Sequence, residues 1–428
     1  MKVLIAGAGI GGLSAAIALR NDGHEVECFD RVREMRPVGA AISVWSNGVK
    51  ALKSFGLEPM QYAGQMDRMA YLKHDSGETY CDFSLDTLYE KVKTRACPIA
   101  RTDLQKILYD GAGHDKVTLN KQVVDYEATD DGITVTFADG SKTAGDFLVI
   151  ADGTHSRLRN KICGMPIERK YVGYINFNAA IPQSALKGTV SSTTWTQFVG
   201  EGKRVSIMPM SQERFYIFFD CVMPKGTATD PEGVKRELAH YFEGWNESVQ
   251  ILIENLDASK IARIEIHDTD PLPTLIDPSG RAALIGDAAH ATAPDLGQGG
   301  CLAMEDAFVL AHLMNKAGLA KTGVKSAPAP TVEGLKQVVQ EYQRVRSERV
   351  GTTVLRARKR AAVTHALDGF DITNQWYKEL EGEDGTHIMD GMSKTILGAP
   401  KELDGMANTH RVLSDDTKPL LVDIADTA

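Results

Sequence analysis

The stretch Val3-Leu4-Ile5-Ala6-Gly7-Ala8-Gly9-Ile10-Gly11-Gly12 decides the fold of this chain. Four aliphatic residues, typical of a buried strand, run directly into a glycine-rich turn. Apolar residues then recur at helical spacing up to residues 21–23, and residues 25–29 have the composition of a second strand. Strand, glycine turn, helix and strand form a βαβ unit, whose parallel strands are joined by a right-handed crossover. We therefore predict an α/β fold with a Rossmann-like domain.

The glycines of this turn have the spacing GxGxxG, through Gly7, Gly9 and Gly12. The first allows a tight turn, the second lets a diphosphate approach the backbone, and the third lets helix and strand pack closely. Gly11 lies in the same turn, and Asp30 follows the second strand, where a carboxylate accepts the hydroxyls of a ribose. The pattern predicts a dinucleotide site, with a merely tight strand-to-helix turn as the alternative.

The composition excludes several other classes of protein. The 428 residues include 48 Lys plus Arg and 57 Asp plus Glu, which leaves no positive excess to neutralise nucleic acid. No stretch approaches the roughly 20 apolar residues of a membrane span, and glycines interrupt the apolar start of the chain. The six cysteines form no CxxC pair, so we expect no metal and a cytoplasmic location. The oligomeric state is left open.

The remaining pattern predicts a discontinuous nucleotide-binding domain. Residues 147–151 and 282–285 are apolar throughout, as in strands buried on both faces, whereas strand candidates cluster between residues 171 and 266. Residues 301–314 and 338–360 have helical patterns. We expect the nucleotide-binding domain at residues 1–73, 101–172 and 276–360, a β-sheet substrate domain at 74–100 and 173–275, a C-terminal helical segment at 361–400 and a weakly packed tail at 401–428.

Further motifs follow in order along the chain. Asp152-Gly153 and Gly286-Asp287-Ala288-Ala289-His290 each follow one of the apolar runs, and Arg101 begins a helix before them. The second motif leads into Pro294-Asp295-Leu296-Gly297-Gln298-Gly299-Gly300. With the GxGxxG turn, these motifs make the chain resemble the single-component flavoprotein monooxygenases, the aromatic hydroxylase family that includes para-hydroxybenzoate and salicylate hydroxylases. The resemblance covers most of residues 1–315.

This resemblance implies FAD as the bound cofactor. Asp287 would bind the ribityl chain and Arg101 the ribose or diphosphate, although a helix cap and a surface salt bridge are the plainer alternatives. A helix that begins beside the flavin would favour the negative charge that the ring gains on reduction. There is no second GxGxxG, so NADH or NADPH is expected to dock transiently. The implied cofactor residues outside the first turn are Arg101, Asp152, Asp287, Gly297, Gly299 and Gly300.

Within this family the chain most resembles the members that hydroxylate urate. The resemblance extends to about residue 400, and it is densest in residues 38–45, 198–206, 263–268 and 294–301. It implies that Arg204, Tyr216 and Asp295 hold the substrate, a planar monoanion that an arginine fork suits. Asp295 would accept ring N–H groups, and Tyr216 would add a hydroxyl. The alternatives are a pair between Arg204 and Glu201, a loop end at Asp295 and a packed sheet face at Tyr216.

The implied activity is the FAD-dependent hydroxylation of urate at C5, in purine catabolism. Urate, O2 and NAD(P)H would give 5-hydroxyisourate and water through a hydroperoxide at flavin C4a. One alternative is another heteroaromatic substrate, such as a hydroxynicotinate, or a salicylate-like acid, whose carboxylate Asp295 would repel. The alternative from another class is a non-catalytic nucleotide-fold protein that binds prenylated GTPases, which would not need a flavin motif at Asp287.

Overall fold

The computed structural model describes residues 1–35, 39–228, 233–319, 331–406, 409–413 and 419–423. Its first layer is a five-stranded sheet in which every pair of neighbours is parallel. Ile5 of the central strand lies between Val149 and Cys28. In order across the sheet, the strands are β17 (Ala282–Leu284), β11 (Phe147–Ile150), β1 (Lys2–Ala6), β2 (Glu25–Phe29) and β7 (Val117–Thr118).

Three helices cover this parallel sheet: α1 (Ile10–Asn21), α4 (Arg101–Ala112) and α9 (Gly299–Lys316). Helix α1 packs against both of the others, and strands β1, β11 and β17 are almost wholly buried. A small antiparallel sheet, which contributes to the same hydrophobic core, adjoins this layer. Its strands are β8 (Val123–Ala128), β9 (Ile133–Phe137) and β10 (Lys142–Gly145).

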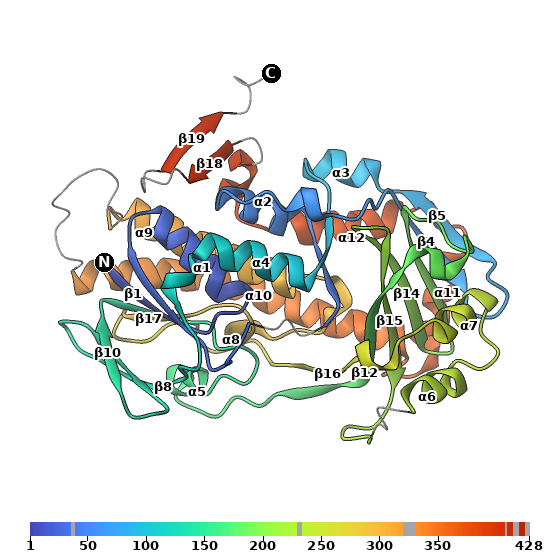
Figure 1. Ribbon diagram of the computed structural model, residues 1–428, viewed down its shortest axis with the longest axis horizontal. Coiled ribbons are helices and arrows are strands. Elements are labelled where there is room, and N and C mark those ends of the chain that lie inside the picture. Colours follow the sequence, from blue (N-terminus) through green and yellow to red (C-terminus); the bar gives the residue numbers. More distant parts are fainter. Residues whose placement is uncertain (36–38, 229–232, 320–330, 407–408, 414–418, 424–428) are drawn as a thin grey trace.

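The second layer is a seven-stranded sheet, which stands at the right of Figure 1. Helices α6 (Val234–Tyr241) and α7 (Glu247–Glu254) bury Phe242 and Trp245 in a separate core with Phe177 and Phe219 of this sheet. In order, the strands are β16 (Ala262–Asp268), β12 (Lys170–Pro182), β15 (Arg214–Val222), β14 (Lys203–Met210), β13 (Thr194–Gly200), β4 (Arg68–Lys73) and β5 (Thr79–Ser84).

Shorter elements and the C-terminal helices join the layers. Helix α10 (Val332–His365) has 34 residues, about 50 Å at the usual rise per residue, and runs along the long axis in Figure 1. The other elements are β3 (Ala41–Val44), α2 (Ser46–Ser54), η1 (Pro59–Tyr62), α3 (Asp86–Val92), β6 (Cys97–Ala100), η2 (His114–Lys116), α5 (Leu158–Cys163), η3 (Gln183–Leu186), η4 (Ala258–Lys260), α8 (Asp287–His290), η5 (Pro294–Leu296), α11 (Phe370–Leu380), α12 (Thr386–Leu397), η6 (Lys401–Met406), β18 (Thr409–Leu413) and β19 (Pro419–Asp423).

The expected α/β class, with a parallel sheet and a second β-rich layer, is confirmed. Two expected boundaries differ from the structure. Strand β4 pairs with β13, so the second sheet begins before residue 74, and α10 continues through residue 360 to His365. Across the described ranges, no helix is long and apolar enough to cross a membrane.

The first residues of the expected tail make two contacts with the rest of the protein. Leu403 in η6 is fully buried, and Asp404 forms an ion pair with Lys50 of α2. Strands β18 and β19 form an antiparallel pair, and β18 contacts both α2 and η6. Residues 407–408, 414–418 and 424–428 of the expected tail lie outside the described residues.

A buried ion-pair network fastens α10 to α9. The Arg346 guanidinium, which has no exposed surface, donates to Glu305 and Asp306, each at 2.7 Å. Asp306 also accepts the backbone N–H of Gly286 at 2.8 Å and lies 2.6 Å from Nε2 of His290. Burial alone would raise the pKa of Asp306, but the charges of His290 and Arg346 outweigh it and lower the pKa to about 2. The turn between β17 and α8 is therefore held by a carboxylate that stays ionised.

Arg346→Met should destabilise the protein strongly, because it removes the cation that two buried carboxylates share and leaves Glu305 only Arg349 and Asp306 only His290. We expect a loss of about 3–5 kcal/mol in the free energy of unfolding, measured with urea. Arg344→Met is the matched control on the same helix, because Arg344 pairs with Glu341 at the exposed surface. Equal effects of the two substitutions would contradict a structural role for the buried network.

Candidate active site

A cavity of about 400 Å³ lies where the two layers meet. One wall comes from the turns that follow β1, β11 and β17, at the carboxyl edge of the parallel sheet, where ligands bind in open α/β sheets. Strands β12, β14 and β15 of the second sheet form the opposite wall. Of the residues predicted from the sequence, the lining includes Gly9, Gly11, Arg101, Arg204, Tyr216, Asp287, Asp295, Gly297, Gly299 and Gly300.

The glycines of the first turn fall into two groups. A Cβ on Gly7 would meet the carbonyl oxygen of Ala151 at 2.2 Å, and one on Gly12 would meet that of Gly7 at 1.8 Å. These two glycines let the turn pack and do not line the cavity. A Cβ on Gly9 would have no atom within 4 Å, and Gly9 faces the cavity immediately before the first turn of α1. The turn therefore leaves a space bounded by the amide groups of a helix N-terminus, which suits a diphosphate.

Asp30 and Asp152 also lie outside the cavity lining. The Asp30 carboxylate accepts the backbone N–H of Ala8 at 2.7 Å and that of Val32 at 3.0 Å, so it braces the glycine turn. Burial raises the pKa of Asp152, whose Oδ1 is buried and has no hydrogen-bond partner among the described residues. This buried oxygen, beside the cavity, can accept a hydrogen bond from a polar group of a bound cofactor.

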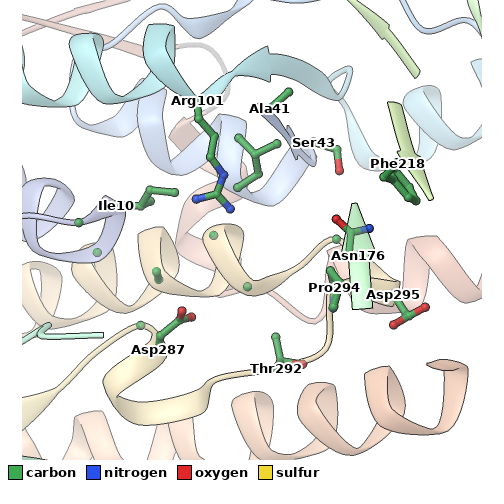
Figure 2. A pocket seen from close by; sticks show the side chains of 18 of the residues that line it. Ile10, Ala41, Ser43, Arg101, Asn176, Phe218, Asp287, Thr292, Pro294 and Asp295 are labelled. Atoms are coloured by element: carbon green, nitrogen blue, oxygen red, sulfur yellow. The ribbon is translucent and has the colours of Figure 1, made fainter. Parts of the chain in front are cut away.

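Arg101 and Asp287 lie on two sides of the part of the cavity next to the parallel sheet (Figure 2). Arg101 is the first residue of α4, and its side chain makes no hydrogen bond or ion pair with any other described residue. Asp287 is the first residue of α8 and follows Gly286, whose φ is +59°. Within the described residues, the cavity therefore presents a guanidinium and a carboxylate that form no salt bridge with another side chain.

The second glycine cluster brings the start of α9 to the cavity. A Cβ on Gly297 would meet Nε1 of Trp45 at 2.6 Å, and one on Gly300 would meet Ile42 at 2.7 Å. A Cβ on Gly299 would have only Thr292 within 4 Å, at 3.5 Å. The N-terminus of this 18-residue helix carries a partial positive charge, so the wall suits a planar ring that becomes negative. These features together fit a flavin dinucleotide.

The second sheet supplies an arginine held by buried carboxylates. Arg204 of β14 donates through Nε to Asp220 at 2.7 Å and through Nη2 to Asp295 at 3.2 Å, and its side chain is 8% exposed. Asp220 and Asp295 have no exposed side-chain surface. Nη1 of Arg204 makes no hydrogen bond with the described residues, so its two N–H groups are available to a ligand.

Asp295 differs from the expected substrate acceptor. Its Oδ2 accepts the hydroxyl of Tyr174 at 2.6 Å, while Oδ1 faces Arg204 and His365. Burial would raise the pKa of Asp295, but His365 and Arg204 outweigh it and hold the pKa below the usual range. Both carboxylate oxygens of Asp295 therefore have partners within the protein, one of which is Arg204. The alternative pair between Arg204 and Glu201 is wrong, because Glu201 pairs with Lys203 at 3.0 Å.

Tyr216 and its neighbours complete this wall. Tyr216 of β15 lines the cavity beside Phe218, with their ring centroids 5.4 Å apart, and burial raises the pKa of Tyr216 to about 12. Its hydroxyl therefore stays protonated and can donate a hydrogen bond. The sequence did not single out Asp220, Tyr174 or His365. Only Asp220 leaves a trace, as a carboxylate that interrupts the apolar run of residues 217–222.

The fold and the site thus define a protein whose cavity fits a flavin dinucleotide on one wall and presents a buried arginine on the other. The chain matches the FAD binding domain family over residues 1–321, and we conclude that it belongs to this family. The expected FAD cofactor agrees with this family.

Two relatives match almost the whole chain. The FAD-dependent urate hydroxylase of Klebsiella pneumoniae subsp. pneumoniae is 44% identical over 402 residues, which are 94% of this chain and 100% of that protein. The FAD-dependent urate hydroxylase of Mycolicibacterium vanbaalenii is 44% identical over 404 residues, which are 94% of this chain and 98% of that protein. The expected resemblance is confirmed.

Solved structures agree with the fold. The crystal structure of Klebsiella pneumoniae HpxO complexed with FAD and uric acid has a TM-score of 0.86 and 44% identity, covering 94% of this chain and 97% of that one. A salicylate hydroxylase substrate complex has a TM-score of 0.74 and 22% identity, covering 94% of this chain and 99% of that one. The second likeness concerns the fold alone.

Gly9→Val should abolish FAD binding without unfolding the protein, because the side chain enters the open space of the turn. We expect a colourless protein with an unchanged unfolding midpoint, measured by visible absorbance and urea titration of the apoprotein. Gly12→Val should instead lower the stability, since its Cβ collides with the backbone. A yellow, fully loaded Gly9→Val protein would contradict the assignment of this turn to the cofactor.

Proposed function

We propose that this protein is an FAD-dependent monooxygenase that hydroxylates urate at C5. The balanced reaction is urate, O2, NAD(P)H and a proton giving 5-hydroxyisourate, water and NAD(P)+. The observation that supports it best is Arg204, a cation with free N–H groups in a cavity that also fits a flavin. The identity of 44% with urate hydroxylases over nearly the full length supports the same substrate.

The pocket wall matches the chemistry of a urate monoanion. Nη1 of Arg204 can donate two charge-assisted hydrogen bonds to a carbonyl oxygen and a deprotonated ring nitrogen. Tyr216 can donate to a second carbonyl, and the ring of Phe218 lines the same wall. Because Asp220 and Asp295 hold the guanidinium from behind, its position is set before the substrate binds.

On the opposite wall, Gly9, Arg101, Asp287, Gly299 and Gly300 would hold FAD. FAD held by these residues would supply the redox chemistry, which is hydride acceptance from the reduced nicotinamide and activation of O2. The residues of this chain orient urate and exclude water from the cavity. Since the electron-rich urate anion attacks through its own C5, no protein nucleophile is required.

We also infer the organisation and surroundings of the enzyme. Residues of the parallel sheet and its helices form the FAD-binding part, and the seven-stranded sheet with α6 and α7 forms the substrate part. All six cysteines are free, which supports a reducing compartment and hence the cytoplasm. Small molecules, and not nucleic acid, are the proposed partners, in agreement with the net charge of −9.

The direct test is oxidation of NADH or NADPH by the FAD-loaded protein with and without urate. We expect urate to accelerate coenzyme oxidation, with the ultraviolet absorbance of urate lost in equal molar amount. Salicylate and 6-hydroxynicotinate serve as the comparison substrates. Faster turnover of either one than of urate would contradict the proposal.

Arg204→Gln should uncouple coenzyme oxidation from urate hydroxylation. Glutamine removes the charge and the fork, a loss of about 1.5–3 kcal/mol in a charge-assisted contact, or roughly ten- to hundred-fold in kcat/KM. A misplaced C5 is not hydroxylated, and reduced oxygen leaves as hydrogen peroxide. The measurement is peroxide formed per NADH consumed at saturating urate.

Lys203→Gln, on the adjacent position of β14, is the control for this substitution, because Lys203 pairs with Glu201 at the surface. An Arg204→Gln protein as tightly coupled as the parent would contradict the role of Arg204. The free energy of unfolding is measured in parallel, because the substitution also removes a cation that pairs with the buried Asp220 and Asp295.

A further inference from the structure

His365, near the end of α10, lies behind the arginine of the pocket wall. Its side chain has no exposed surface, and its ring centroid is 4.2 Å from that of Tyr174. Nε2 is 3.4 Å from Oδ1 of Asp295 and 3.8 Å from Oδ2 of Asp220. Neither ring nitrogen makes a hydrogen bond with the part of the chain that the structure describes. The buried imidazole thus lies close to two carboxylates but forms a hydrogen bond with neither of them.

The charges of this cluster do not balance without His365. Asp220 and Asp295 carry two negative charges, and Arg204 supplies one positive charge. Tyr174 is neutral, because burial raises the pKa of its hydroxyl well above the ordinary value. An unpaired charge removed from water is strongly unfavourable. A proton on His365 cancels the excess negative charge and turns the contacts of Nε2 with the carboxylates into attractions.

We propose that His365 carries this proton and is a positioning residue of the anion-binding wall, which it keeps electrically neutral behind Arg204. The proposal rests on the proposed function, because its consequence concerns an anionic substrate. With a neutral group at this position, the wall carries a net charge of −1 and repels the urate monoanion. With the proton in place, the wall is neutral and the free N–H groups of Arg204 attract the anion.

The test compares His365→Gln with the double variant His365→Gln/Asp220→Asn. Glutamine is uncharged, and asparagine removes one negative charge but retains an oxygen that accepts from Nε of Arg204. Asp220→Asn alone is measured as the reference for the double variant, because its amide also loses the oxygen that accepts from Nδ2 of Asn176 at 2.8 Å. We expect His365→Gln to raise the KM for urate, and the dissociation constant from flavin absorbance titration, at least tenfold, with a smaller change in kcat. The double variant should recover most of this loss, because its charges balance again.

Stability gives a readout that needs no substrate. We expect His365→Gln to lower the midpoint of urea unfolding and the double variant to raise it again. His240→Gln, at a side chain that is 89% exposed, is the control that should change neither quantity. If His365 acted through packing alone, the double variant should have a lower unfolding midpoint than His365→Gln, since two substitutions would damage the core more than one.

Two results would overturn the inference. One is a His365→Gln protein with unchanged urate affinity and stability, and the other is a double variant as impaired as His365→Gln in both. Failure of the proposed function looks different: the parent protein would then show no urate-dependent spectral change or turnover. In that case the unfolding midpoints of the two variants alone decide whether His365 balances the charge of the cluster.

Discussion

The pairing of Arg346 with Glu305 and Asp306 is the interaction on which the cofactor side of this protein depends. The two carboxylates lie within α9, and Asp306 also holds the backbone of Gly286 at 2.8 Å. Arg346 therefore ties the long helix both to the wall that begins at Gly299 and to the turn that presents Asp287. A buried charge that is paired in this way is costly to disturb, so the geometry of both segments is fixed together.

Helix α10 also contributes a residue to the buried charged cluster behind Arg204, at its C-terminal end. Its residue His365 lies beside Asp295 and Asp220, which hold Arg204 in the opposite wall of the cavity. One continuous helix thus contacts the supports of both walls. Because oxygen transfer depends on the distance between two bound rings, a rigid element that spans both supports preserves the alignment that the reaction requires.

Local features of the sequence predicted the fold class and the kind of cofactor well. The strand at residues 25–29 matches β2, and the spacing of Gly7, Gly9 and Gly12 placed the first turn between a strand and a helix. The wall behind Arg204 could not be predicted, since Asp220 and His365 are 145 positions apart and belong to no local pattern. The contacts of Asp295 could not be predicted for the same reason, because only the fold brings its carboxylate to Tyr174 and Arg204.

The reach of α10 also limits how this chain can be divided. The match to the FAD binding domain family ends at residue 321, whereas α10 begins at Val332. A hybrid gene that joined residues 1–321 to a foreign C-terminal half would encode all the cofactor glycines but not the guanidinium that Glu305 and Asp306 require. The segment that sequence comparison marks as a module is therefore not a module for recombination, and exchange between relatives has to carry the long helix along with it.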